Sequence, residues 1–341
     1  MTWVPEKEGN WLFHCHISDH VSPERRLSEH AGAHQHHTNT SHDRSAGMAG
    51  MILGVSVAGM SAAAAHPSTA ETTARKLTLT MQSEPGGDGA YPVYGFALSD
   101  EGEPPAAAKV SVPGPTVVLH RGKPVEIALV NRLPEATAIH WHGIELDSYY
   151  DGVHGWSGVG TRVTPLIEPG RTFVVRFTPP RAGTFIYHTH LHDHQLASGM
   201  YGALVVLEPG ETFDPALDHV VVIGQGGPGN DAPTILNGSR KQQFVWSAAA
   251  RHRLRFINIT PGDIFVMSLA KADGPVEWRP LTKDGVPVPA EDSAPGPATQ
   301  TMAVGETFDF EYQAPPGRHS LWLNVRTPAG RWVAQGRVVI K

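Results

Sequence analysis

Cysteine is almost absent from this chain. Of its 341 residues only Cys15 is a cysteine, so no disulfide can form within the chain and cysteine pairing gives no information on its compartment. Charge is also sparse, because 18% of the residues are charged, the formal net charge is −6, and the Lys and Arg residues are scattered. Nucleic-acid binding requires a concentrated basic surface, so we expect no nucleic acid partner.

The chain also lacks long helical periodicity. No heptad or extended amphipathic pattern is present, whereas Gly occurs 36 times and Pro 29 times. Alternating apolar segments such as TFVVRFTP and KPVEIALV are separated by turn sequences such as EPG and GKP. This pattern predicts an all-β protein built from antiparallel sandwiches.

Long apolar runs are missing except for residues 46–66. This run resembles a signal-peptide core or a short membrane span, but it is rich in Gly and Ala, has only Arg44 as a positive flank and lies inside the chain. Its segment GMILGVSV (50–57) matches GMYGALVV (199–206). We therefore expect a β-strand here and no membrane span.

One sequence unit occurs three times in the chain. Residues 1–20 align with residues 175–194 without a gap. Residues 308–326 repeat the aromatic, Pro and Gly pattern, but they have Leu323 and Asn324 where the first copy has His-Cys and the second has His-Thr. The aligned polar pairs are His14 with His188, Cys15 with Thr189, His16 with His190, Asp19 with Asp193, and His20 with His194.

The repeat predicts the domain organisation. Residues 1–60 correspond to the C-terminal end of a domain and contain a histidine-rich loop at 25–47, which either recruits copper or is simply solvated. Residues 61–72 form a linker, and residues 73–209 and 215–341 are two complete domains, the second without the repeated histidines.

The residues around Cys15 have the chemistry of a metal site. A thiolate, two imidazoles and a weak thioether form the blue-copper site, and Cys15, His20 and a following Met supply three of these four ligands. On a strand, the side chains of His14 and His16 point to the face opposite Cys15. One short strand can therefore contact two metal centres.

These motifs together resemble the multicopper oxidases, a laccase-like family of Greek-key cupredoxin β-sandwiches. The resemblance depends on four segment groups: FHCHISDH (13–20) with GMILGVSV, AIHWHG (138–143) with DG (151–152), YHTH (187–190) with GMYGALVV, and PTILNG (233–238). Each motif alone is weak, whereas two dual-histidine motifs with His-Cys-His are specific.

The resemblance implies a set of copper ligands and one acid. Asp151 resembles the acid that helps to deliver protons to the cluster, although a turn-forming role before Gly152 stays open. The implied ligands are Cys15, His20 and Met51 for type-1 copper, with Met48 as the rival axial ligand; His140 for type-2 copper; and His142, His188, His190, His14 and His16 for the type-3 pair.

The implied activity is that of an oxidase with oxygen as acceptor. Such an enzyme couples one-electron oxidation of a reducing substrate at type-1 copper to four-electron reduction of O2 to water at a trinuclear copper cluster. The reductant is a small molecule such as a phenol or an aromatic amine, or cuprous ion. The resemblance also implies a periplasmic or extracellular location.

One family motif, His-Pro-x-His-x-His, is missing from the sequence. The chain thus offers six of the eight cluster histidines and one of the two type-1 histidines, and the end of the family's last domain precedes its first. We expect a permuted, N-terminally truncated chain, with the motif upstream in the gene or on a complementing chain. A copper nitrite reductase-like enzyme and an inactive copper-binding fragment are the alternatives.

Overall fold

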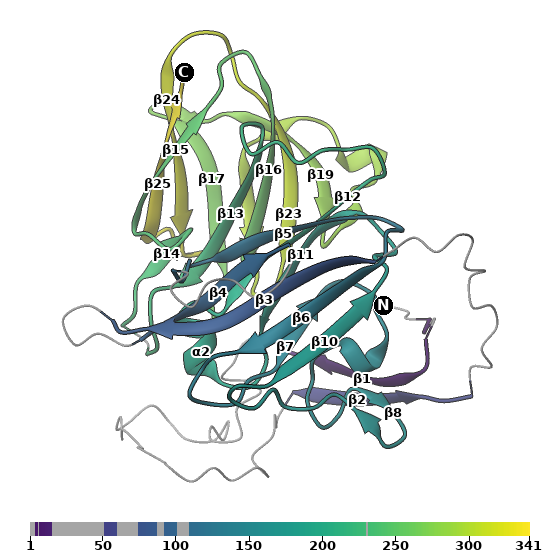
Figure 1. The fold of residues 1–341 in the computed structure, drawn as a ribbon. Coiled ribbons are helices and arrows are strands. Elements are labelled where there is room, and N and C mark those ends of the chain that lie inside the picture. The colour runs from purple at the N-terminus through teal and green to yellow at the C-terminus, as the bar shows by residue number, and fades with distance from the viewer. Residues whose placement is uncertain are drawn as a thin grey trace.

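The computed structural model describes residues 4–5, 7–15, 51–59, 74–86, 92–100, 109–229 and 231–341. Two β-sandwiches lie one above the other in Figure 1, and a small separate sheet flanks the lower one. Strands dominate the described residues, so the expected all-β class is confirmed. The predicted linker 61–72 and the histidine-rich loop 25–47 lie outside the described residues.

The first sandwich consists of two four-stranded sheets around one core. Side chains alternate between the two faces of each strand, and Leu77, Leu79 and Trp141 point into this core. One sheet contains β10 (Thr172–Phe177), β6 (Val125–Asn131), β3 (Arg75–Glu84) and β4 (Val93–Ser99); the other contains β5 (Gly114–His120), β12 (Tyr201–Leu207), β11 (Gly183–Thr189) and β7 (Ile139–His142). The short helix α2 (Asp193–Ala197) precedes β12.

The second sandwich also has two sheets, and its core includes Trp246, Phe256 and Phe310. One sheet contains β14 (Thr234–Leu236), β13 (Asp218–Gln225), β16 (Arg251–Asn258), β23 (Thr307–Gln313), β19 (Glu277–Lys283) and β20 (Val286–Pro287), with β21 (Gly296–Pro297) beside β19. The other contains β15 (Lys241–Trp246), β25 (Trp332–Ile340), β24 (His319–Arg326), β17 (Phe265–Lys271) and β18 (Gly274–Pro275), with β22 (Thr299–Met302) beside β17.

The two sandwiches are joined by a buried interface. Ile186 and Tyr201 of the first pack against Val222 and Ile257 of the second. A buried polar network lies beside this apolar cluster: the Thr184 hydroxyl donates to Asp309 at 2.6 Å, and Asp309 accepts from Arg253 at 2.8 Å and from Arg255 at 3.0 Å. Because a buried carboxylate needs partners of this kind, the network fixes how the sandwiches dock.

The small sheet joins two strands from the first 60 residues to a loop of the first sandwich. Strand β1 (Gly9–His14) pairs antiparallel with β2 (Ile52–Val57) on one side and with β8 (Gly158–Val159) on the other; β8 pairs with β9 (Arg162–Val163). The apolar run is therefore a strand at 52–57, as expected from the repeat. Figure 1 shows this hairpin beside β8, below the first sandwich.

No helix among the described residues is long and apolar enough to cross a bilayer.

Candidate metal centre

Strands β7 and β11 bring the two dual-histidine motifs together. In their antiparallel register His188 lies directly opposite His140, and Tyr187 lies opposite Trp141. Side chains alternate along each strand, so Trp141 and Tyr187 are buried in the sandwich core while the histidines project from the other face. The His-Trp-His spacing therefore places both imidazoles of the motif on one surface.

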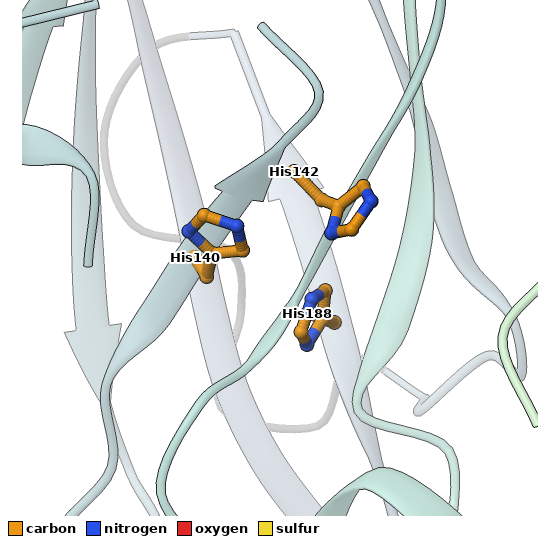
Figure 2. Close-up of side chains that lie close together, drawn as sticks. All are labelled: His140, His142 and His188. Carbon is orange, nitrogen blue, oxygen red and sulfur yellow. The ribbon is translucent and has the colours of Figure 1, made fainter. Parts of the chain in front are cut away.

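Three of these imidazoles have the geometry of a metal-binding group. One ring nitrogen from each of His140, His142 and His188 lies within 4.8 Å of the others. Figure 2 shows the three rings converging from β7 and β11. The His190 ring lies 5.2 Å from the His140 ring, centroid to centroid, and the His14 ring lies 5.8 Å from the His190 ring. Five imidazoles, carried by β1, β7, β11 and the residue that follows β11, thus form one cluster.

Backbone carbonyl groups orient three rings of the cluster. The Nδ1 of His140 bonds to the Asp151 carbonyl oxygen at 2.6 Å, that of His188 to the carbonyl oxygen of the next residue at 2.7 Å, and that of His14 to the Cys15 carbonyl oxygen at 2.9 Å. A carbonyl oxygen only accepts, so each Nδ1 carries the hydrogen. The Nε2 lone pair of each ring is then available to a metal ion.

Burial disfavours the charged form of His190. It lowers the pKa of His190 well below its ordinary value, and repulsion from His140, His188 and His14 lowers this pKa further. A neutral imidazole is the form that binds a metal ion. The cluster is therefore disposed to bind a cation.

Strand β1 reaches the cluster because it docks on the loop at 147–163. The Ser148 hydroxyl donates to the Asn10 carbonyl oxygen at 2.6 Å, and the Asn10 amide donates to the Trp156 carbonyl oxygen at 2.9 Å. Gly9 permits this approach: it has φ +132°, and a Cβ there would lie 2.4 Å from the Ser148 Cβ. These contacts hold His14 at the end of β1.

Asp151 lies beside the cluster and is buried. One carboxylate oxygen lies 3.6 Å from the His140 Nδ1, and the other accepts a hydrogen bond from the Ser157 hydroxyl at 3.2 Å. Its backbone carbonyl fixes the His140 tautomer. Asp151 also ends the short 3-10 helix Ser148–Tyr150, so the turn-forming role and the position next to His140 occur together.

Cys15 lies across the hairpin from Met51. The Cys15 backbone N–H donates to the Met51 carbonyl oxygen at 3.1 Å, and the Thr189 N–H donates to the Met200 carbonyl oxygen at 3.0 Å. The two copies of the repeat therefore have the same register. Met51 is 54% exposed, whereas Met200 is fully buried in the core of the first sandwich.

In the second copy of the repeat, Thr189 stands where the first copy has Cys15, and it belongs to a network of hydrogen bonds. The Thr189 hydroxyl donates to the Gln195 side-chain oxygen at 2.8 Å, and Thr137 donates to the same oxygen at 2.9 Å. The Gln195 amide and the His194 Nε2 both bond to Glu135, at 3.0 and 2.8 Å. Although burial opposes it, these two bonds lower the pKa of Glu135. His194 is therefore a hydrogen-bond partner of Glu135 in this copy.

The structure brings five predicted ligands together, and a sixth, Cys15, follows His14 directly in the chain. The Met51 backbone carbonyl accepts a hydrogen bond from the Cys15 N–H. The alternative axial ligand Met48, together with His16 and His20, lies outside the described residues. Sequence reasoning missed Ser148 and Trp156, which position β1, and the network around Glu135. The contacts of these residues are with segments far away in the chain, so no local pattern signals them.

Comparison with known proteins shows similarity to copper-containing oxidases over part of the chain. A family model described as multicopper oxidase matches residues 103–211. The copper resistance protein A homolog of Pseudomonas syringae pv. tomato is 36% identical over 149 residues, which are 43% of this chain and 24% of that protein. The L-ascorbate oxidase of Cucumis sativus is 38% identical over 104 residues, which are 30% of this chain and 17% of that protein.

Solved structures share the fold. The multi-copper oxidase from Pseudomonas thermotolerans superposes with a TM-score of 0.59 and 22% identity, over 78% of this chain and 63% of that one. The matched part of this chain spans about a quarter of the copper resistance protein. Copper is the cofactor to which the names of these relatives point.

Proposed function

We propose that this chain is part of a laccase-like oxidase that couples oxidation of a small reductant to reduction of O2 to water, because residues 103–211 match a family model described as multicopper oxidase. The observation that carries the proposal is the convergence of imidazoles from β1, β7 and β11 on one cluster. A single type-2 copper, as in a nitrite reductase-like enzyme, needs fewer imidazoles than this cluster provides.

The donor set fits copper ions. Imidazole and thiolate are ligands that copper prefers, and both are present at one end of β1. Carbonyl groups hold the Nδ1 hydrogens of His14, His140 and His188, which directs their Nε2 atoms away from the backbone as ligands. We propose His140 for type-2 copper, with the type-3 ligands His142, His188, His190, His14 and His16. Bound copper would supply the one-electron redox chemistry.

Strand β1 links the proposed type-1 copper site to the histidine cluster through the polypeptide backbone. We propose Cys15, His20 and Met51 as type-1 ligands, and the shared register of Cys15–Met51 and Thr189–Met200 supports Met51 at the axial position. The Cys15 carbonyl also accepts the hydrogen bond from the His14 ring. Cys15 is therefore linked to the cluster both through the backbone and through a hydrogen bond.

Asp151 is proposed as the acid that supplies protons at the cluster. Its carboxylate lies 3.6 Å from the His140 Nδ1 and bonds to the Ser157 hydroxyl, which is also buried. A carboxyl group in this position can hold a proton next to the site where oxygen is reduced. The neighbouring hydroxyl fixes its orientation.

Ligands from beyond these strands are needed to complete the proposed site. We propose a further segment or a complementing chain bearing His-Pro-x-His-x-His. Exposed apolar side chains in the hairpin and just before it support a β-partner there: Val4 is 74%, Leu53 62% and Phe13 41% exposed. The other two strands of this small sheet, β8 and β9, have two residues each, so the hairpin gains stability from such cover. We propose the periplasm or the cell exterior as its location.

Oxygen uptake by the protein expressed from its whole reading frame tests this function. Copper-loaded protein is expected to consume O2 with a phenol, an aromatic amine or cuprous ion as reductant, and the Cys15→Ser variant is expected to lose that activity. The 341 residues alone are expected to give no intense blue absorption and negligible turnover. Full copper loading without oxygen uptake, or turnover unchanged in Cys15→Ser, would contradict the proposal.

A further inference from the structure

The second sandwich has an open groove far from the histidine cluster. It lies on the outer face of the sheet formed by β15, β25 and β24, at the upper left of Figure 1, and has a volume of about 1070 Å³. Its lining includes Arg240, Lys241, Gln243, Trp322, Trp332 and Arg337. The proposed oxidase site uses none of these residues.

The strand register builds this face in cross-strand rows. Gln243 of β15, Arg337 of β25 and Trp322 of β24 are neighbours in one row, and Lys241 and Gln335 are neighbours in the next. The residues between them along each strand, such as Leu321 and Val338, point into the core. Neighbouring strands lie about 4.8 Å apart. An extended ligand crossing the strands would therefore meet a new side chain at each strand.

The groove has charge of one sign. Arg240, Lys241 and Arg337 line it, and no Asp or Glu does. None of the three forms an ion pair with another residue in the part of the chain that the structure describes. The Arg337 guanidinium donates a long hydrogen bond, 3.3 Å, to the Ser320 hydroxyl. In a chain of net charge −6, this cationic face complements an anionic ligand.

Two exposed indole rings accompany the cations. Trp322 is 38% and Trp332 is 48% exposed, although indole rings are normally mostly buried. The Arg326 guanidinium stacks over one face of the Trp332 ring, 3.8 Å from the ring centroid, and so places a further cation beside this residue of the lining. Gln243 lies beside Arg337 in one row and Gln335 lies beside Lys241 in the next, and each side-chain amide can both donate and accept hydrogen bonds.

We propose that this groove binds an acidic polysaccharide, namely an extended chain of pyranose rings that carries carboxylates. The faces of the sugar rings would stack on Trp322 and Trp332, the hydroxyls would bond to the amides, and the carboxylates would pair with Lys241 and Arg337. A polyanion without hydroxyls would leave the amides unused, and a neutral glycan would leave the cations unused. The proposal concerns a surface distinct from the copper site and does not depend on the proposed oxidase function.

Isothermal titration calorimetry with hexagalacturonate tests the proposal, in parallel with maltohexaose, poly-L-glutamate and polystyrene sulfonate. Hexagalacturonate is expected to bind with the same affinity to copper-free and copper-loaded protein, and more weakly as salt is added. The Trp322→Ala variant and the double variant Lys241→Gln/Arg337→Gln should each weaken binding by about tenfold or more, which corresponds to the loss of roughly 1.4 kcal/mol. Lys123→Gln, an exposed cation of the first sandwich, is the matched control and should bind like the parent protein.

The other ligands supply the outcomes that would overturn the proposal. Equal binding of maltohexaose would remove the role of the cations, and equal binding of poly-L-glutamate would remove the role of the rings. Preference for polystyrene sulfonate would identify an aromatic polyanion instead, and absence of hexagalacturonate binding to folded protein would refute the site. Sedimentation of the parent protein as a dimer that Trp322→Ala converts to a monomer would identify a second copy as the occupant.

Discussion

Cys15 donates its backbone N–H to the carbonyl oxygen of Met51 at 3.1 Å, although 36 positions separate the two residues in the chain. Thr189 and Met200 make the same bond at 3.0 Å with a separation of 11. The longer connection in the first copy thus leaves the hairpin register unchanged. The repeated unit has a thiol in one copy and, in the other, a hydroxyl that bonds to Gln195.

Removal of one imidazole should weaken metal binding at the cluster. In His188→Ala, one of the three nitrogen atoms that lie within 4.8 Å of one another is lost. We expect copper(II) affinity at this site to fall by about 100-fold or more, because loss of an outer-shell partner alone costs 10–100-fold. Competition with a chelator, followed by metal analysis, measures the loss. His120→Ala, on the exposed end of β5, is the control, and equal copper retention in both variants would contradict the assignment.

Gly9→Ala should release β1 from the first sandwich. A Cβ at Gly9 would lie 2.4 Å from the Ser148 Cβ, and its φ of +132° is unfavourable for alanine, at about 1–3 kcal/mol. We expect amide hydrogen exchange in residues 9–14 to become at least about tenfold faster while the sandwich cores stay protected. Gly122→Ala is the control: Gly122 also has a positive φ, but no atom lies within 4 Å of a Cβ built there. This variant therefore has the backbone strain without the steric clash. Unchanged protection of β1 in Gly9→Ala would refute the docking.

The histidine cluster could be predicted from the sequence alone, whereas the docking of β1 could not. The cluster histidines are readable because a repeat with period-2 strands fixes which side chains share a face, and the register of β7 with β11 agrees with that pattern. The docking of β1 on Ser148 joins residues 138 positions apart and depends on the shape of a loop. No periodicity encodes such a contact. The groove between Trp322 and Arg337 arises in the same way, from strand order.

Asp309→Ala should strongly destabilise the interface between the sandwiches. Asp309 is fully buried and accepts hydrogen bonds from Arg253, Arg255 and Thr184, so its removal leaves the buried Arg255 with fewer partners. We expect the free energy of unfolding to fall by about 3–5 kcal/mol. Urea unfolding measures this change. Glu126→Ala breaks the exposed pair with Arg176 and should cost no more than about 1 kcal/mol. Similar losses of unfolding free energy in both variants would show that the buried network stabilises the fold no more than an exposed ion pair does.

The second sandwich should lose stability in acid because of His219. Burial first, and then the adjacent His252, lower the pKa of His219 to about 4 from 6.5. The unfolded chain therefore binds more protons between these pH values, so this contribution to the unfolding free energy is complete above pH 6.5 and is lost as the pH falls through 4. The full loss is about 3 kcal/mol.

Replacement of His219 isolates this contribution. His219→Phe keeps an aromatic ring stacked on Trp246 and removes the hydrogen bond to His252, so we expect a lower stability at pH 7 and a flatter decline between pH 6.5 and 4. Urea unfolding at pH 7, 5.5 and 4 gives the slope. His319→Phe changes a histidine with a local bond to Gly317 and should keep the parent slope. If His219→Phe declines as steeply as the parent protein, the acid sensitivity arises from another group, and His219 binds protons to the same extent in the folded and the unfolded chain.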